Sequence, residues 1–242
     1  KHEGELDSLR IFVSAGAPIP SAVVEQAGKV LKAKIVSAWG MTENGAVTMT
    51  CPEDPAERAS QSDGKALPYM DVKVTDFQGN ELPAGEEGSL LVRGSSLFVG
   101  YLKRPELYGV DEAGWFNTGD LARIDKDGYI RITGRTKDVV IRGGENIAPA
   151  EIEDVLVEHP QVRDCAVVGA EDAEWGQSIV AVVVPAPGPA PAVEDLRAFV
   201  RAHLRGSRTP DRVVFRSELP TNATGKVLRR ELVEQLSVKE SA

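Results

Sequence analysis

Residues 35–43 read IVSAWGMTE, and the apolar first half of this stretch predicts a β-strand that Gly40 ends. A second short apolar run, residues 9–13, precedes it in the chain. Between the two runs, apolar residues at helical spacing follow Ser21, a residue type favoured at helix N-caps. The order strand, helix, strand predicts the edge of a parallel sheet.

The loops that follow these two strands carry candidate binding residues. Ligands of open parallel sheets bind beyond the carboxyl ends of the strands, so we expect the loops after Val13 and Trp39 to face one site. The indole of Trp39 is suited to stack on a base, the hydroxyl of Thr42 to contact a phosphate, and the carboxylate of Glu43 to hold Mg²⁺. A strand-ending Trp is also commonly a core residue, and that alternative stays open.

Composition and charge argue against several classes of protein. The 242 residues carry a formal net charge of -9, whereas a general nucleic-acid binder normally shows a basic patch. Cys51 and Cys165 lie far apart, outside any disulfide framework or zinc motif, so we expect buried free thiols in a reducing, cytoplasmic setting. The longest apolar run, residues 179–184, is too short to span a membrane.

The remaining sequence predicts two further structural parts. Short alternating runs separated by turn residues between Gly64 and Arg135 predict a small antiparallel barrel or sandwich. A boundary is expected at residues 134–138, and a compact α+β part follows it. Its expected helices cover residues 148–157, 193–204 and 226–236, and its expected strands cover residues 162–168, 179–184 and 212–215, the second of them central.

Three later segments carry polar groups, each with two interpretations. Asp120 ends the run WFNTGD, where it either closes a turn or accepts both hydroxyls of a ribose. Arg135 and Lys137 lie between glycines, as in a hinge with an anion contact or in a plain inter-strand turn. Lys226 ends the run LPTNATGK at the expected start of the last helix, where the helix dipole disfavours a cation. A phosphate or carboxylate ligand would relieve that conflict, and a solvated Lys is the alternative.

Five ordered motifs together resemble those of the AMP-forming ligases, which include acyl-CoA synthetases, firefly-type luciferases and the adenylation domains of peptide synthetases. The family pattern is an aromatic-Gly-x-Thr-Glu segment, a Thr-Gly-Asp, a Gly-Arg-x-(Lys/Asp)-Asp hinge, a Gly-Gly-Glu-Asn loop and a terminal Thr-Gly-Lys. The chain has them in this order, at residues 39–43, 118–120, 134–138, 143–146 and 224–226. The resemblance extends from Leu9 to the end and corresponds to the C-terminal half of such a ligase.

The resemblance implies a fold class of α/β plus α+β in two domains. Residues 1–136 would be the C-terminal part of a large N-terminal domain, with the end of a parallel sheet layer over 1–63 and a small antiparallel β-barrel-like subdomain over 64–136. Residues 137–242 would be a small, mobile α+β C-terminal domain that swings about a hinge at Lys137.

The resemblance also implies a nucleotide site in the first domain. In it, Gly16, Ala17 and Pro18 would line the adenine pocket, and Trp39 would stack on the base. Asp120 would hold the ribose hydroxyls, and Arg135 would assist at the ribose or phosphate. Gly40 and Ile132 would belong to the same nucleotide site. By the same resemblance Thr42 contacts the α-phosphate, Glu43 binds Mg²⁺, and Gly40 and Met41 line the acyl pocket.

The implied reaction has two halves and uses ATP, Mg²⁺ and CoA. A carboxylate attacks the α-phosphate of ATP to give acyl-AMP and pyrophosphate, and a thiol then displaces AMP to give a thioester. Lys226 would serve the first half. The loop of Gly143, Gly144 and Glu145 would replace it at the site for the second half.

One family element does not occur in these 242 residues. It is the Ser/Thr/Gly-rich loop ending in Pro-Lys-Gly, which in the family grips the β and γ phosphates. We therefore expect a fragment of a larger ligase, with negligible ligase activity by itself. Residues 37–46 look most like those of ligases for medium or alicyclic acids, such as cyclohexanecarboxylate.

Two alternatives to an acid:CoA ligase stay open. One is an adenylation domain that activates an aryl or amino acid and loads a carrier protein. The other is a non-catalytic nucleotide-binding module, although such a module would not need to keep Glu43, Asp120, Arg135 and Lys226. The expected partners are a small-molecule carboxylic acid, ATP and CoA, without nucleic acid or a membrane span, and a homodimer is compatible with the sequence.

Overall fold

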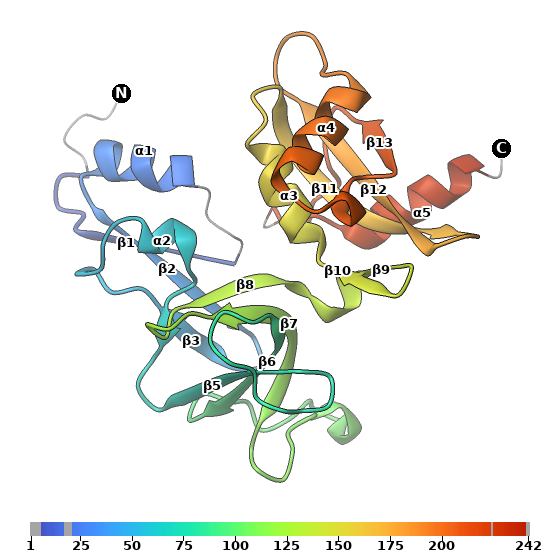
Figure 1. Cartoon of the computed structure of the whole chain (residues 1–242). Coiled ribbons are helices and arrows are strands. Elements are labelled where there is room, and N and C mark those ends of the chain that lie inside the picture. The colour runs from blue at the N-terminus through green and yellow to red at the C-terminus, as the bar shows by residue number, and fades with distance from the viewer. Residues whose placement is uncertain (1–5, 17–20, 224, 241–242) are drawn as a thin grey trace. The chain divides into compact units, whose positions relative to one another are not determined.

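The computed structural model describes residues 6–16, 21–223 and 225–240. The chain divides into two compact units, residues 1–133 and residues 134–242, which are described separately below (Figure 1). Within the described residues, no helix is long and apolar enough to cross a membrane. Of the two cysteines, Cys165 is buried as expected, but Cys51 is exposed, so the expectation of two buried thiols is wrong for Cys51.

The first sheet of unit 1 has the order β1-β2-β3-β4. Strands β1 (Ile11–Ala15) and β2 (Lys34–Met41) are parallel and connected through helix α1 (Ser21–Leu31), as the sequence predicts. Strands β3 (Gly45–Met49) and β4 (Lys65–Ala66) add to it antiparallel. Gly40 does not end β2, because the pairing shifts register at Trp39 and Gly40 and the strand continues to Met41.

Strand β1 is the edge of this sheet in the described part of the chain. Its three apolar residues are half exposed, at 47% for Ile11, 47% for Phe12 and 52% for Val13. Parallel strands are normally covered on both faces, so this exposure is unusual for β1. Val24 of α1 forms a small core with Ala59 of helix α2 (Arg58–Gln61), and Ile35 of β2 packs against it.

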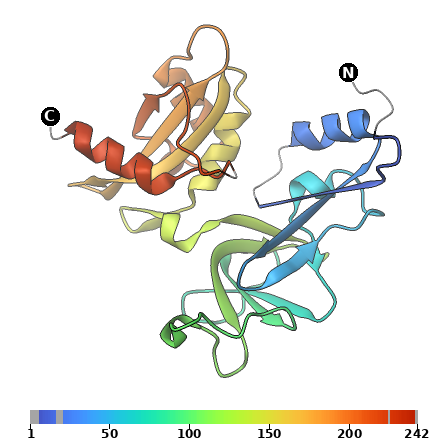
Figure 2. The ribbon, with the colours of Figure 1, turned by 180° about the vertical axis from the view of Figure 1, so that it is seen from behind.

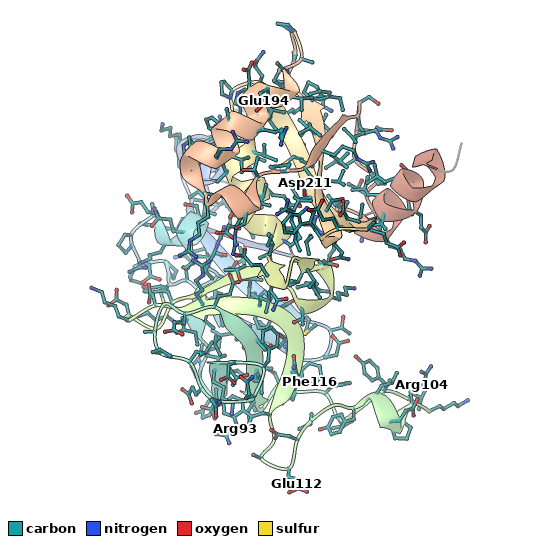
Figure 3. All side chains as sticks on the ribbon, turned by 45° about the vertical axis from the view of Figure 1, so that its right-hand side comes forward. Arg93, Arg104, Glu112, Phe116, Glu194 and Asp211 are labelled. Carbon is teal, nitrogen blue, oxygen red and sulfur yellow. The ribbon has the colours of Figure 1, made fainter. Side chains whose placement is uncertain are left out.

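The second sheet of unit 1 has the order β5-β6-β7-β8. Its strands are β5 (Met70–Thr75), β6 (Gly88–Gly94), β7 (Phe116–Ile124) and β8 (Ile130–Arg135). The first three pair antiparallel, as the alternating sequence predicts. In the described residues the expected barrel-like subdomain is an open antiparallel sheet and not a closed barrel. The short helix η1 (Pro105–Leu107) lies in the β6–β7 connection, where Figure 3 labels the adjacent Arg104.

Unit 2 is built on a three-stranded sheet of order β11-β12-β13. Strands β11 (Val162–Asp172) and β12 (Gly176–Pro185) are antiparallel, and β13 (Arg212–Phe215) is parallel to β12. The central position of β12 confirms the prediction from its continuous apolar sequence. A hairpin of β9 (Val140–Arg142) and β10 (Glu145–Ile147) follows the short helix η2 (Thr136–Asp138).

Helices cover both faces of this sheet. Helices α3 (Pro149–Val157) and α4 (Val193–His203) pack on one face, and α5 (Arg229–Glu240) packs on the other, as Figure 2 shows from behind. Successive side chains of a strand point to opposite faces. Accordingly Ile179 and Ala181 of β12 belong to the core under α3 and α4, while Val180 and Val182 belong to the core under α5.

The last helix begins later than the sequence predicts. It starts at Arg229, so Lys226 lies in a turn before the helix. The argument that the helix dipole disfavours a cation at Lys226 is therefore wrong.

Leu196 and Val193 of α4 provide a test of the core of unit 2. Leu196 is fully buried against the sheet, whereas Val193, on the same helix, is 39% exposed. Leu196→Ala should lower the free energy of unfolding by about 2–5 kcal/mol because it leaves a cavity. Val193→Ala should lower it by less than about 1 kcal/mol, since little apolar area is lost from the core. Urea unfolding followed by circular dichroism measures both, and equal losses would contradict this packing.

Candidate functional site

Strand β3 has a β-bulge opposite Trp39 and Gly40 of β2. Trp39 pairs with Thr48 and Gly40 pairs with Ala46, so the partner strand carries one extra residue. A Cβ at position 40 would lie 1.8 Å from the carbonyl oxygen of Gly45. Only glycine permits this approach of β2 to β3. The bulge lies directly before the point where the chain leaves β2 towards Thr42 and Glu43.

The segment that holds Asp120 is a second irregularity in strand pairing. Ser89 pairs with Leu121 and Leu91 pairs with Asn117, so the residues between Asn117 and Leu121 bulge out opposite one residue of β6. The Thr118 hydroxyl donates a hydrogen bond to the Leu90 carbonyl oxygen (2.9 Å) and accepts one from the Asp120 amide (3.1 Å). These bonds fix the bulge and leave the Asp120 side chain buried.

The two bulges meet through their side chains. The indole N–H of Trp39 donates a hydrogen bond to Oδ2 of Asp120, with 3.2 Å between the heavy atoms. Trp39 and Ile132 both pack against the core of the second sheet. Trp39 is therefore partly buried against this core and also contacts Asp120. Three of the residues expected to hold a nucleotide thus lie together in unit 1.

The turn after β2 is held by its own polar groups and by the chain beyond β6. The Met41 amide donates to the side-chain oxygen of buried Asn44 (2.8 Å). The Tyr101 hydroxyl donates to Oε1 of Glu43 (2.6 Å), and this bond raises the pKa of Tyr101. The Phe98 amide donates to the Glu43 carbonyl oxygen (2.8 Å). Glu43 is therefore fixed through both its backbone and its side chain.

Glu43 is suited to bind a magnesium ion that arrives with a nucleotide. In the described residues no three His, Cys, Asp or Glu side chains cluster as metal ligands. Mg²⁺ commonly takes one or two carboxylates and completes its coordination with water and substrate phosphates, so a single carboxylate fits it. Thr42 beside it is exposed and accessible to a phosphate.

The structure gives less information on the other residues expected at this site, which are Gly16, Ala17, Pro18 and Arg135. Gly16 follows β1 with a φ of 94°, a backbone conformation that favours glycine. Ala17 and Pro18 lie outside the described residues. Arg135 is partly buried at the end of β8 and belongs to unit 2.

Asp63 is a polar residue at this site that the sequence did not indicate. Its Oδ2 accepts a hydrogen bond from the Ile132 amide (2.8 Å), 69 residues away in the chain. Burial raises the pKa of Asp63, and the charge of Asp120 adds to the rise, whereas the Ile132 bond and the charge of Arg131 lower it. In sequence, Asp63 followed by Gly64 has only the pattern of a turn. Tyr101, 58 residues from Glu43, likewise carried no local signal.

In unit 2, the expected thioester loop is the turn between β9 and β10. Gly143 and Gly144 have positive φ values of 57° and 84°, which a tight turn requires. The Gly143 amide donates to the Trp175 carbonyl oxygen (2.8 Å), and a Cβ at Gly143 would lie 2.9 Å from the Trp175 ring. Glu145 is exposed, and hydrogen bonding to Ser207 together with the nearby Arg208 lowers its pKa.

Asp211 anchors the same hairpin to the main sheet of unit 2. It lies just before β13, where Figure 3 labels it, and accepts two hydrogen bonds from Arg142 (3.0 and 2.8 Å). Its Oδ2 also accepts the Ile179 amide of β12 (2.8 Å). Asp211 therefore joins the hairpin to the central strand, through a forked ion pair with Arg142 on one side and the Ile179 hydrogen bond on the other.

Lys226 lies in a structured turn. Its amide donates to the Asn222 side-chain oxygen (2.9 Å), and its carbonyl oxygen accepts the Asn222 amide (2.9 Å). Lys226 is exposed, as is Lys137 in η2. Unit 2 therefore presents the two lysines and the Gly143–Gly144 turn, while unit 1 carries the Trp39 and Asp120 pair.

Two family models match the chain. The AMP-binding enzyme model matches residues 1–102, and the AMP-binding enzyme C-terminal domain model matches residues 151–226. The chain therefore belongs to the AMP-binding enzyme family, the AMP-forming ligases, and the resemblance drawn from the five motifs is confirmed.

Known relatives share its sequence and its structure. The medium-chain fatty-acid–CoA ligase of Escherichia coli (strain K12) is 36% identical over 98% of this chain and 43% of that protein. The fatty acid–[acyl-carrier-protein] ligase ScoC of Streptomyces coeruleorubidus is 38% identical over 94% and 45%. ATP-bound MatB from Rhodopseudomonas palustris matches with a TM-score of 0.87 at 34% identity, over 93% and 45%. The chain thus spans less than half the length of these proteins.

Gly40→Ala tests the first bulge. The new methyl group would collide with the Gly45 carbonyl oxygen, so we expect the free energy of unfolding to fall by about 1–3 kcal/mol. Gly28→Ala is the matched control, because Gly28 lies in α1 with nothing near its Cβ position and Ala favours helix. Thermal unfolding of both variants measures the effect. A Gly40→Ala variant as stable as Gly28→Ala would refute the tight approach.

Asp63→Asn tests the buried carboxylate. The raised pKa means that folded Asp63 binds its proton more tightly than the unfolded chain does. Its contribution to stability is therefore lost as pH rises from the ordinary carboxyl pKa through the raised one. Asn cannot ionise but can still accept the Ile132 amide. We expect the variant to gain stability over the wild type across that window, measured by urea unfolding at several pH values.

Asp76→Asn is the control with the opposite sign. Hydrogen bonding from Asn80 lowers the pKa of Asp76, so its contribution is present above the ordinary pKa and lost as pH falls through the lowered one. The variant should therefore lose stability relative to the wild type at neutral pH. The same trend with pH in both variants would show that the sign for Asp63 is wrong.

Proposed function

We propose that this chain is part of an ATP-dependent carboxylic acid:CoA ligase that forms acyl-AMP and then acyl-CoA. The observation that carries the proposal is the contact between Trp39 and Asp120 at two adjoining bulges. An aromatic ring beside a buried carboxylate suits a nucleoside, since the ring can stack on a base and the carboxylate can accept ribose hydroxyls. The family membership supports the same choice.

The phosphate side of the proposed site is formed by Thr42 and Glu43. Thr42 would donate its hydroxyl to the α-phosphate, and Glu43, held by Tyr101, would bind Mg²⁺. When bound with ATP, Mg²⁺ would neutralise charge on the phosphates as the carboxylate attacks. Gly40 and Met41 would border the acyl group, because they lie in the same bulged strand end.

Unit 2 would supply two loops in turn. Lys226 would contact the reacting carboxylate and α-phosphate during acyl-AMP formation. Rotation about Lys137 would then withdraw Lys226 and bring the turn at Gly143 and Gly144 to the site for thioester formation. Arg135 would assist at the ribose or phosphate. Hinge motions of this kind are a common way to run two steps at one site.

The chain spans less than half the length of its relatives, and this limits the activity expected of the 242 residues alone. The relatives are about twice as long, and the chain lacks the Pro-Lys-Gly phosphate loop of the family. We therefore propose nucleotide binding with negligible turnover for the 242 residues alone. CoA is the proposed acceptor, and the name of ScoC makes a carrier protein the second candidate. A cytoplasmic location, a homodimer and the choice of acid stay predictions.

Calorimetric titration with AMP and with a non-hydrolysable acyl-sulfamoyl-adenosine tests the proposal. Both should bind the 242-residue chain, and Asp120→Asn should weaken binding by at least about tenfold, or 1.4 kcal/mol, because an amide is a poorer acceptor for ribose hydroxyls. Asp71→Asn is the control, since Asp71 is exposed and pairs with Arg93 away from the site. No binding by the wild type, or equal affinity for both variants, would contradict a nucleoside site at Asp120.

A further inference from the structure

The guanidinium of Arg229 lies where three separate segments of unit 2 meet. Its Nη2 donates to Oε2 of Glu153 (2.8 Å), and its Nη1 donates to Oε1 of the same carboxylate and to the Val167 carbonyl oxygen (3.0 Å). Its Nε lies 3.6 Å from Oδ2 of Asp138. Oε1 of Glu153 also accepts the Val167 amide (2.6 Å), so the cluster is closed onto β11.

Asp138, Glu153 and Arg229 itself are each adjacent in sequence to an element with a proposed moving role. Asp138 directly follows Lys137 in η2. Glu153 is on α3, the helix that follows the β9–β10 hairpin with its Gly143–Gly144 turn. Arg229 is the first residue of α5 and follows the Lys226 turn. The Arg229 side chain therefore contacts both the hinge segment and helix α3. Arg229 and Glu153 are 76 residues apart in the chain.

The side chains of the cluster are mostly buried, so their charges need each other as partners. The side chains of Arg229 and Glu153 are 26% and 15% exposed. Removing one partner of such a pair leaves a poorly solvated charge without its counterion, so the contacts resist separation. A guanidinium can satisfy a forked carboxylate and a further acceptor together, which a Lys ammonium cannot do in the same geometry.

We propose that Arg229 is a positioning residue that couples the hinge segment to the Lys226 turn and to helix α3, so that these elements move as one body. The functional meaning rests on the proposed function, which assigns roles to Lys137 and Lys226. If two loops alternate at one site through rotation about Lys137, the turn that carries Lys226 has to keep its place relative to the hinge. Arg229 supplies that constraint by contacting Asp138 from the first turn of α5.

Hydrogen–deuterium exchange on the 242-residue chain tests the coupling. Arg229→Met keeps an unbranched apolar stem but removes the guanidinium with its charge and donors. We expect exchange to speed up by about tenfold or more at residues 137–143 and 221–228 together, because local opening becomes easier in both. Arg229→Lys should restore part of the protection. Arg230→Met is the matched control, since Arg230 is 92% exposed and pairs with Glu234 on its own helix.

The pattern of exchange separates coupling from packing alone. A purely structural role would lower the unfolding midpoint and speed exchange evenly through unit 2. Faster exchange in α5 alone, with residues 137–143 unchanged, would overturn the proposal. Should Arg229→Met not fold, Asp138→Asn weakens only the hinge contact and keeps the Glu153 pair. It should still speed exchange at residues 221–228, and no change there would equally overturn the coupling.

The two proposals fail in distinguishable ways. The exchange experiment needs no nucleotide, so it reports on the coupling whether or not the chain binds AMP. Loss of AMP binding in the wild type with the exchange pattern intact would refute the proposed function alone. An adenylate analogue that binds normally while the exchange pattern is absent would refute the role of Arg229 alone.

Discussion

The hydrogen bond from Trp39 to Asp120 links the two sheets of unit 1 at the candidate site. A buried carboxylate needs donors, and an indole N–H removed from water needs an acceptor, so each side chain satisfies the other. Trp39 lies beside the bulge of β3, and Asp120 lies within the bulge of β7, so the contact joins an irregular point of one sheet to an irregular point of the other. The site is therefore a product of irregular pairing in two sheets that are otherwise ordinary.

Unit 2 is organised differently, around a three-stranded sheet that is covered on both faces. The alternating side chains of β12 pack under α3 and α4 on one side and under α5 on the other. This core holds the ends of the strands and helices from which the turns at Gly143 and Lys226 emerge. Ionic contacts then join these turns to the core, through Asp211 for the hairpin and through Arg229 for the last helix.

Sequence predicts the parts of this architecture that depend on local pattern. The continuous apolar run of β12 and the helical spacing in α4 are visible in the sequence, as are the five motifs. The contacts of Asp63, Tyr101 and Arg229 are not, because each joins residues at least 58 positions apart. The two bulges also escape prediction, since they arise from register between strands. The continuation of β2 past Gly40 escapes prediction for the same reason, whereas the last helix starts late because the hydrogen bonds of Asn222 hold Lys226 in a turn before it.

The half-exposed apolar strand β1 affects how the 242 residues behave in solution by themselves. An edge strand carries unpaired backbone groups that can pair with another chain, and Ile11, Phe12 and Val13 add apolar area to that edge. The net charge of -9 opposes the approach of a second molecule through long-range repulsion. Salt screens that repulsion and leaves the apolar attraction in place. Colloidal stability is therefore expected to fall with ionic strength, and the chain is best concentrated in dilute buffer.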